Sequence, residues 1–408
     1  MNQGKVVIVG QGYVGLPLAA ICVAAHMDTV GLEINNSHAR SIRSGEHDLL
    51  SVEGKKTIAN GLSIGKYEVT DDFSEVVDAE IVIYCLPTPL DEHGNPDLSI
   101  LHEALKSTGP YLAENSLLIL ESTSFPGTTR NFFAGYLKEN FLNTNSCDFA
   151  FSPERVDPNN NKWNLSNTPK IVAGLTDHAK IRATKFYESI LDKVVPVDSL
   201  EIAELAKLIE NTYRLINISF INELQVASNK LGIPLRKAIE AASTKPFGFQ
   251  PFYPSAGIGG HCIPVDPVYL NWASRQFGIS LTMIESALEV NRRMYEFVIQ
   301  RMQDLGVPSL SKILIAGIGY KPGITDMRDS PAVQIASKLK TLGYKVFWCD
   351  LNIRDSDLGT RLDSYQNDIS AIIILQEIDS NILNSGISNG SKILDCTGRY
   401  EGIGVVQM

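Results

Sequence analysis

Short apolar runs rich in β-branched residues alternate with helical stretches over the first half of the chain. An apolar stretch from Leu16 to about Ala25 predicts a helix directly after the first of these runs. Strands that alternate with helices favour a parallel sheet with crossover helices. The predicted strands are Val6–Val9, Thr29–Leu32, Ile81–Tyr84, Leu117–Leu120 and Asp148–Phe151.

The pattern changes near Leu200 and changes back after Gly306. The segments Glu201–Gly232 and Leu281–Leu305 predict long helices. Between them, Lys245–Pro267 predicts a loop because it is rich in Gly, Pro and aromatic residues. Strand patterns then return at Lys312–Ala316, Tyr344–Cys349, Ala371–Leu375 and Lys392–Asp395.

These patterns predict the fold class and the domains together. With 408 residues the chain is too long for a single core. We predict an α/β protein in which two Rossmann-like, doubly wound domains are joined by a central all-helical domain. The expected boundaries are residues 1–199, 200–306 and 307–408.

Composition narrows the functional classes. Hydrophobic residues make up 44% and charged residues 20% of the chain, as in soluble globular proteins, and no apolar run is long enough to span a bilayer. The N-terminus lacks a signal-peptide layout, so we expect a cytoplasmic protein that does not bind a membrane. Six cysteines without CxxC spacing argue against a metal site and favour a reducing compartment. The net charge of −10 argues against nucleic-acid binding.

A glycine-rich turn with Gly10, Gly12 and Gly15 follows the first predicted strand and opens a helix. In such a turn the first glycine makes the bend, the second lets the backbone meet a pyrophosphate, and the third lets the helix pack on the strand. Glu33 ends the next strand, where a carboxylate accepts hydrogen bonds from ribose hydroxyls and disfavours a 2′-phosphate. The turn therefore predicts an NAD site.

Cys262 lies in a second glycine-containing segment, Gly259–Pro267. A thiol held in a tight, exposed turn is suited to nucleophilic attack, whereas most lone cysteines are inert core residues. Asp266 is close enough in sequence to orient water or accept a proton, or it caps a helix. Lys207 and Asn211 share a helix face and can stabilise an oxyanion, unless that face is merely solvated.

Further motifs follow one another in a fixed order along the chain. They are Val9–Pro17, Leu86–Leu90, Pro96–Ser99, Glu121–Thr123, Ser152–Arg155, Ala203–Asn211, Gly259–Pro267 and Tyr320–Pro322, with Asp326, Arg328, Ser330 and Pro331. Together they resemble the nucleotide-sugar 6-dehydrogenases of the UDP-glucose/GDP-mannose dehydrogenase family, over nearly the whole chain.

The resemblance implies a four-electron, NAD-dependent oxidation of a sugar C6 hydroxyl to a carboxylate. The intermediate would be held on Cys262 as a thiohemiacetal and then as a thioester. The first domain would bind NAD, the central domain would form a homodimer and supply the catalytic loop, and the third would bind the UDP-sugar.

The resemblance also assigns the site residues. Those implied in catalysis are Cys262, Lys207, Asn211, Asp266, Glu154 and Thr123. Those implied in cofactor binding are Gly10, Gly12, Tyr13, Val14, Gly15, Glu33, His38, Pro87, Thr88, Ser122, Thr123 and Arg328. Those implied in substrate binding are Glu154, Arg155, Lys207, Asn211, Tyr253, Gly257, Ile258, Gly259, Tyr320 and Lys321.

The substrate branch rests on fewer residues. Ser152–Arg155, Lys245–Phe249 and Gly260–Pro267 resemble the UDP-N-acetylglucosamine branch, and Arg155 and Pro158 stand where the UDP-glucose branch has an aromatic residue and an acid. UDP-GlcNAc is therefore the expected substrate, with UDP-GalNAc, UDP-ManNAc and UDP-glucose as alternatives. Two other classes stay open: a nucleotide-binding scaffold with a decayed site, and a two-electron dehydrogenase that has no use for Cys262.

Overall fold

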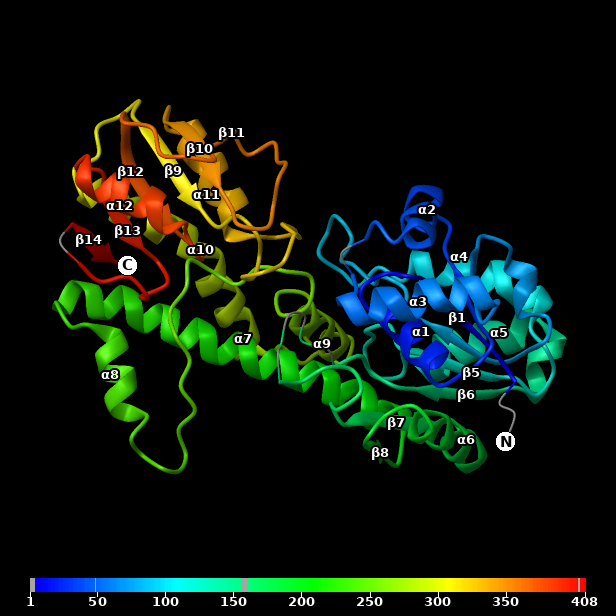
Figure 1. Cartoon of the computed structure of the whole chain (residues 1–408). Coiled ribbons are helices and arrows are strands. Elements are labelled where there is room, and N and C mark those ends of the chain that lie inside the picture. The colour runs from blue at the N-terminus through cyan, green and yellow to red at the C-terminus, as the bar shows by residue number, and fades with distance from the viewer. Residues whose placement is uncertain (1–3, 48, 156, 158–159, 161, 403) are drawn as a thin grey trace. The chain divides into compact units, whose positions relative to one another are not determined.

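The computed structural model describes residues 4–47, 49–155, 157, 160, 162–402 and 404–408 (Figure 1). Its contacts divide the chain into two compact units, Met1–Glu210 with Val268–Gly278, and Asn211–Pro267 with Ile279–Met408. Each unit contains one wound, largely parallel sheet, so the predicted fold class is confirmed. The division into three domains stays a prediction. Pro158, used above to choose a substrate branch, lies outside the described residues.

One eight-stranded sheet forms the centre of the first unit. Its strands are β1 (Lys5–Val9), β2 (Thr29–Leu32), β3 (Tyr67–Thr70), β4 (Ala79–Tyr84), β5 (Leu117–Leu120), β6 (Asp148–Phe151), β7 (Lys170–Gly174) and β8 (Val194–Pro196). They lie in the order β3-β2-β1-β4-β5-β6-β7-β8, parallel from β3 to β6, with β7 antiparallel to β6. The order reverses between β1 and β4, and such a switch point is where wound sheets bind ligands, at the carboxyl ends of the strands.

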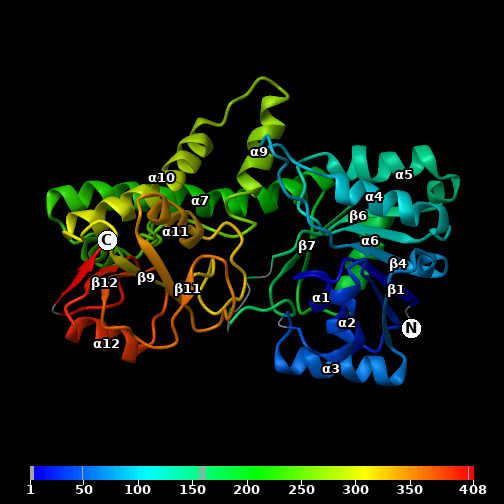
Figure 2. The same ribbon diagram turned by 90° about the horizontal axis from the view of Figure 1, so that it is seen from above.

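Helices cover both faces of this sheet, as Figure 2 shows. Successive strand residues point to opposite faces, so the apolar β1 sequence is buried on both sides. Val6 and Ile8 belong to a core with α1 (Gly15–Ala24), α2 (Asn36–Ser44), α3 (Val52–Ile64) and α6 (Asp177–Glu188). Val7 and Val9 belong to a second core with α4 (Ser99–Thr108), α5 (Gly135–Asn140) and the start of α7 (Leu200–Leu231).

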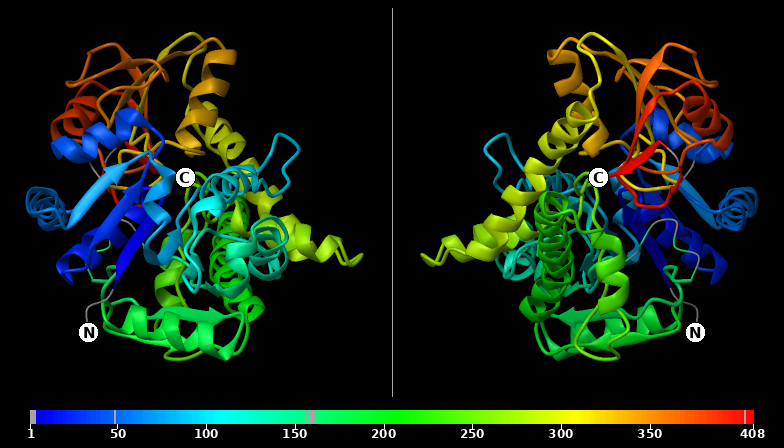
Figure 3. Two further views of the ribbon diagram at one scale, coloured as in Figure 1. Left: turned by 90° about the vertical axis from the view of Figure 1, so that its right-hand side faces the viewer. Right: turned by 90° about the vertical axis from the view of Figure 1, so that its left-hand side faces the viewer.

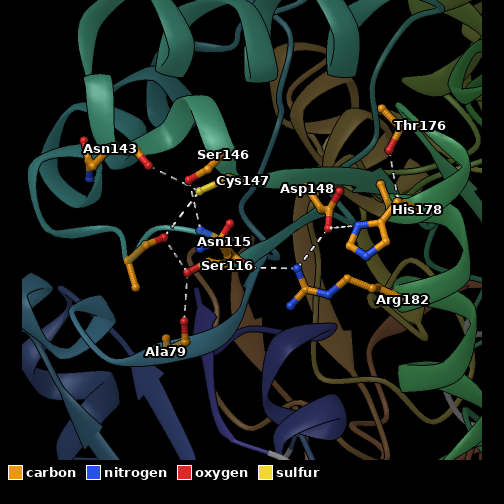
Figure 4. A network of polar contacts seen from close by, with 12 residues as sticks. Ala79, Asn115, Ser116, Asn143, Ser146, Cys147, Asp148, Thr176, His178 and Arg182 are labelled. Atoms are coloured by element: carbon orange, nitrogen blue, oxygen red, sulfur yellow. Dashed lines mark hydrogen bonds and ion pairs between the residues drawn. The ribbon is translucent and has the colours of Figure 1, made fainter.

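A polar network ties α6 to the amino ends of β5 and β6 (Figure 4). Arg182 donates to the Asn115 carbonyl at 2.7 Å and to the Asp148 carboxylate at 2.9 Å. His178 Nδ1 lies 2.8 Å from the same carboxylate. Just before β5, the Ser116 hydroxyl donates to the carbonyl of Ala79, the first residue of β4, at 2.9 Å. The network therefore lies at the amino ends of the strands, on the opposite side of the sheet from their carboxyl ends.

A six-stranded parallel sheet forms the second unit. Its strands are β9 (Lys312–Ala316), β10 (Lys345–Cys349), β11 (Thr360–Arg361), β12 (Ile369–Ile374), β13 (Lys392–Asp395) and β14 (Val405–Gln407), in the order β11-β10-β9-β12-β13-β14. Residues of α10 (Thr282–Asp304) and α11 (Pro331–Thr341) pack on one face and those of α12 (Ser380–Ser388) on the other. The last strand, β14, lies at the sheet edge beside the C-terminus (Figure 3).

The middle of the chain is helical, as the sequence pattern predicts. Besides α7 and α10 it contains α8 (Leu235–Ala242) and α9 (Asp266–Arg275), and residues 200–304 contain no strand. The segment between Ser243 and Val265 lies outside helices, which confirms the predicted loop except for its last two residues, Asp266 and Pro267, which begin α9. None of the described helices has the length and apolar character needed to cross a membrane.

Candidate active site

The carboxyl ends of β1, β4, β5 and β6 are neighbours at one edge of the first unit's sheet, and each leads into a predicted site segment. The glycine turn follows β1, Pro87-Thr88 follows β4, Ser122-Thr123 follows β5 and Glu154 follows β6. Because these strands are parallel and adjacent, the segments lie along the same edge, which is the ligand-binding edge of such sheets.

The glycine turn has the geometry that a pyrophosphate requires. Gly10 has a backbone φ of +92°, a value that residues with a side chain rarely adopt. A Cβ at Gly12 would meet no described atom within 4 Å, so the backbone there is open to a ligand. A Cβ at Gly15 would lie 1.8 Å from the Gly10 carbonyl oxygen, so only glycine lets α1 pack here. Tyr13 and Val14 complete the turn at the amino end of α1, and the whole segment fits NAD.

Glu33 and His38 both contact the backbone of this turn. The Glu33 carboxylate accepts a hydrogen bond from the Asn35 N–H at 2.8 Å and a longer one, 3.3 Å, from Gln11. His38 Nε2 lies 2.8 Å from the Gln11 carbonyl, so this nitrogen carries the hydrogen. The Gln11 side chain is buried and accepts a hydrogen bond from the Tyr67 hydroxyl at 2.7 Å. Burial raises the pKa of Tyr67, which therefore stays a donor.

Gln11 and Tyr67 were not predicted as site residues. Gln11 occupies a variable position of the glycine motif, and Tyr67 is far away in sequence, so only the fold reveals that they support the turn.

The segments after β4 and β5 are fastened to each other. The Leu86 N–H donates to the Ser122 hydroxyl at 2.9 Å, and the Ser122 N–H donates to the Tyr84 carbonyl at 3.3 Å. The Tyr269 hydroxyl donates to the Thr88 carbonyl at 3.0 Å. These bonds fix the backbone that carries Pro87, Thr88 and the half-buried Thr123.

Glu154 and Lys207 form a largely buried pair. Lys207 Nζ donates to the Glu154 carbonyl at 2.7 Å and lies 3.2 Å from its Oε2 atom. The two side chains are only 8% and 13% exposed, so their attraction is screened less than that of a surface pair. The sequence predicted both residues separately, and the fold brings them together.

Arg155, predicted to contact substrate, is held by the protein itself. Its guanidinium lies 2.6 Å from the Glu210 carboxylate and donates to the Pro169 carbonyl at 2.7 Å. These contacts anchor the loop after β6 to α7 and to the strand that follows.

The second unit contains Cys262, whose exposure separates it from the other five cysteines. All six are thiols, five are buried and Cys262 is half-buried. Burial raises the pKa of Cys147 to about 11 and that of Cys349 to about 12, and it also raises the pKa values of Cys22, Cys85 and Cys396. Buried thiols of this kind are poor nucleophiles, so Cys262 is the one suited to react.

The backbone around Cys262 requires its glycines. Gly260 has φ +86°, and a Cβ there would lie 2.8 Å from the Tyr320 ring. A Cβ at Gly259 would lie 2.6 Å from the Asp329 carbonyl oxygen. The Cys262 carbonyl accepts the Asp266 N–H at 2.9 Å, which places the thiol residue just before α9.

Asn211 and Asp266 meet inside the second unit. Asn211 Nδ2 donates to Asp266 Oδ2 at 2.6 Å, and both residues are buried. This bond uses one of the two hydrogens of the Asn211 amide nitrogen and fixes the direction of the amide group. The sequence predicted both residues but not their contact.

The predicted sugar loop, which contains Tyr253, Gly257 and Ile258, is held by two asparagines. Asn291 accepts the Ile258 N–H at 2.6 Å, and Asn222 accepts the Ser255 N–H at 2.9 Å. The Arg236 guanidinium lies 4.5 Å from the centre of the Tyr253 ring. Neither asparagine was predicted, because an isolated Asn in a helical pattern gives no functional indication.

Lys321 and Arg328, predicted to bind the substrate and the cofactor respectively, follow a turn after β9 that contains Gly317 (φ +82°) and Gly319. Lys321 is half-buried next to Tyr320. Arg328 binds Asp326 through its backbone N–H at 2.9 Å and through Nε at 2.8 Å. Although burial raises the pKa of Asp326, these hydrogen bonds hold it below its usual value. In the turn itself, the Ile318 N–H donates to the Asp350 carboxylate at 2.8 Å.

The predicted residues therefore form one group in each unit. The first unit holds the NAD turn with Glu33, His38, Thr88, Ser122, Thr123, Glu154, Arg155 and Lys207. The second holds Asn211, Tyr253, Gly257, Ile258, Gly259, Cys262, Asp266, Tyr320, Lys321 and Arg328.

Comparison with known proteins identifies the family. Domain models of the UDP-glucose/GDP-mannose dehydrogenase family match residues 4–191 (NAD binding domain), 201–293 (central domain) and 314–382 (UDP binding domain).

Individual relatives have names that agree with this family assignment. A UDP-N-acetyl-D-mannosamine dehydrogenase of Methanocaldococcus jannaschii is 30% identical over 92% of this chain and 86% of its own length. A UDP-N-acetyl-D-glucosamine 6-dehydrogenase of Pseudomonas aeruginosa is 32% identical over 85% of this chain and 82% of its own. The solved structure of a UDP-D-ManNAc dehydrogenase from Pyrococcus horikoshii superposes with a TM-score of 0.88 at 28% identity, covering 99% of this chain and 98% of its own.

The resemblance noted in the sequence is thereby confirmed, and NAD is the cofactor of the matched domain. This chain belongs to the UDP-glucose/GDP-mannose dehydrogenase family and is an NAD-dependent nucleotide-sugar dehydrogenase.

Proposed function

We propose that this enzyme oxidises the C6 hydroxyl of a UDP-N-acetylhexosamine to the uronic acid for surface polysaccharide precursor synthesis, with UDP-GlcNAc as the first substrate to test. The observation that carries the proposal is the half-buried thiol of Cys262 on a loop that requires its glycines. The relatives named above act, by their names, on UDP-ManNAc and UDP-GlcNAc, which supports an N-acetylated sugar.

In the proposed reaction, loss of the hydroxyl proton and of a hydride from C6 gives an aldehyde. The Cys262 thiolate adds to the aldehyde carbon, and the carbonyl oxygen takes up a proton to give a thiohemiacetal. Loss of that proton and of a second hydride gives a thioester, which water cleaves to the carboxylate and the regenerated thiol. NAD supplies the hydride acceptor for both oxidations.

The other groups act on protons and charge. Lys207 and Asn211 donate hydrogen bonds to the oxygen that becomes negative. Asp266 accepts a proton or orients water, Glu154 serves in thioester hydrolysis and Thr123 holds a water or the cofactor. The pairs Lys207–Glu154 and Asn211–Asp266 support these roles, because each joins a donor to a carboxylate in a buried setting.

The decisive experiment measures product and NADH together. We expect two NADH per sugar and loss of carboxylate formation in Cys262→Ala, whereas the matched variant Cys147→Ala keeps the parent rate. One NADH per sugar would indicate a two-electron dehydrogenase. NAD binding without turnover on any UDP-sugar would indicate a scaffold. A Cys262→Ala enzyme that makes uronic acid at the parent rate would refute the thioester route.

The sugar is decided by turnover on a panel of UDP-GlcNAc, UDP-ManNAc, UDP-GalNAc and UDP-glucose. Highest kcat/KM on UDP-GlcNAc supports the first choice. UDP-ManNAc is the alternative that the archaeal relative's name favours.

We also propose that the enzyme works in the cytoplasm as a homodimer joined through α7. Ile202, Leu205 and Ile209 are 48%, 36% and 53% exposed on this helix. They recur three and four residues apart and form an apolar stripe, which a second copy of the chain would cover.

A further inference from the structure

One buried carboxylate, that of Glu204, joins helix α7 to the segment that follows β5. Glu204 is fully buried in the first unit. Its Oε2 atom accepts the Gly127 N–H at 2.6 Å, and its Oε1 atom accepts the N–H and the hydroxyl of Thr129 at 2.8 and 2.6 Å. Gly127, with φ +94°, directly precedes the π-helical turn Thr128–Ala134, so Glu204 accepts the N–H of the residue before this turn and that of its second residue, Thr129.

Both sides of this connection carry proposed site residues. Thr123 lies four residues before Gly127 on the segment that Glu204 holds. Lys207 lies three residues after Glu204, and both are buried, so they share one face of α7.

We propose that Glu204 is a positioning residue: its ionised carboxylate holds the Thr123–Thr129 segment against α7, so that Thr123 and Lys207 keep the relative placement that oxidation needs. The inference rests on the proposed function, in which Thr123 and Lys207 act at the site. A displacement of about 1 Å at reacting groups costs roughly a hundredfold in rate, so a connection of this kind affects kcat without touching substrate.

The surroundings make the connection sensitive to pH. Burial raises the pKa of Glu204 to about 7, against the opposing effect of the Thr129 and Gly127 hydrogen bonds. Within four residues of Glu204 and of Thr129 along the chain, the charged groups are Glu201 and Arg130, which pair with each other at 2.7 Å, and Lys207, which contacts Glu154. A protonated carboxyl cannot accept hydrogen bonds at both oxygens as a carboxylate does, so the connection weakens as Glu204 takes up a proton.

The test compares pH profiles of kcat for the parent and Glu204→Gln, with the UDP-sugar that gives the highest turnover. We expect the parent kcat to fall as pH drops through about 7. Glu204→Gln should lose about tenfold or more in kcat at pH 8, lack that acidic decline, and keep KM for NAD within about twofold, since the glycine turn is untouched.

The chain offers a matched control on the same helix. Glu201→Gln removes the same charge one turn earlier, from a side chain that is 36% exposed and pairs with Arg130. It should keep kcat within about twofold at pH 8, because surface pairs contribute little. Thr129→Val removes one donor and should move the acidic decline to higher pH.

Amide hydrogen exchange tests the role of Glu204 independently of the proposed function. At pH 8 we expect the peptide containing Gly127 and Thr129 to exchange at least about tenfold faster in Glu204→Gln than in the parent, which holds even if no UDP-sugar is oxidised. Unchanged exchange, or a parental kcat and pH profile in Glu204→Gln, overturns the inference. If Glu204→Gln does not fold, Thr129→Val decides by the same two measurements.

Discussion

Glu121 and Glu204 are two buried carboxylates of the first unit with different partners. Glu121 pairs with a lysine, whereas Glu204 accepts hydrogen bonds from neutral groups. Lys170 Nζ lies 2.8 Å from the Glu121 carboxylate, and the two side chains are 2% and 1% exposed. Glu204 is equally buried, but it accepts its hydrogen bonds from N–H and O–H groups. Hydrogen bonds from neutral groups offset only part of the desolvation of this carboxylate, so burial raises the pKa of Glu204.

The raised pKa of Glu204 predicts how stability depends on pH. Its pKa rises from an ordinary 4.5 to about 7 in the folded protein. Between these values the unfolded chain is ionised while the folded chain retains the proton. The free energy of unfolding therefore falls with rising pH, by about 1.4 kcal/mol per pH unit from this group, and levels off above pH 7. Its contribution is fully present below the unfolded pKa.

Urea unfolding of the parent and Glu204→Gln at pH 5, 6, 7 and 8 checks this expectation. The difference in the free energy of unfolding between the two proteins reports on Glu204, because the pH dependence of the other titratable groups is the same in both and cancels. We expect the free-energy difference to move in favour of Glu204→Gln as pH rises, and a constant difference would contradict the assignment.

At the scale of elements, helix α6 is held to its sheet by polar groups at one end. Arg182 bridges the Asp148 carboxylate and the Asn115 carbonyl, as Figure 4 shows. The Asp148 side chain is 12% exposed, so removing the guanidinium leaves a poorly hydrated charge, whereas His178 beside it is 74% exposed. These contacts therefore fix the amino half of α6 to the start of β6 and to the segment before β5.

Arg182→Ala should lower the free energy of unfolding by about 1–2 kcal/mol, because a hydrogen-bonded, partly buried charge loses its partner. Urea unfolding measures the change. Lys180→Ala is the control on the same helix, since its partner Asp177 is 90% exposed, and it should change stability by less than about 0.5 kcal/mol. Equal effects of both variants would show that the network adds nothing specific.

Sequence patterns predicted the elements that are apolar and continuous, and missed those that are not. Leu117–Leu120 and Lys312–Ala316 form strands with the predicted bounds. β3 and β7 were missed because Tyr67–Thr70 carries Glu68 on its exposed side and β7 opens with Lys170. Neither strand presents an unbroken apolar run, and the fold places Lys170 beside Glu121 instead.

The individual residues of the candidate site could be predicted from the sequence, but the contacts between them could not. The glycine turn, Glu154, Lys207 and Cys262 stand in motifs whose spacing is local. The bond between Asn211 and Asp266 joins residues 55 positions apart, which only the folded chain brings together. Glu204 escaped notice because a glutamate in a helical pattern usually faces solvent.

At the scale of the whole molecule, the exposed stripe of α7 predicts the oligomeric state. Ile209→Glu places a charge on this stripe, where Ile209 is 53% exposed, so it should leave the subunit folded but weaken self-association. Light scattering coupled to size-exclusion chromatography should give a dimer mass for the parent and a monomer mass, at low micromolar concentration, for the variant. Ile181→Glu, on an exposed apolar residue of α6, is the control and should stay dimeric.

The contrast between one half-buried cysteine and five buried ones also bears on the handling of this protein. Peroxide reaches exposed thiols first and converts them stepwise to sulfenic and then sulfinic acid. We expect a preparation kept without reductant to lose turnover while its circular dichroism stays unchanged. Mass spectrometry should then find the added oxygen on the peptide containing Cys262, and prompt treatment with dithiothreitol should restore activity only while the damage is still at the first stage.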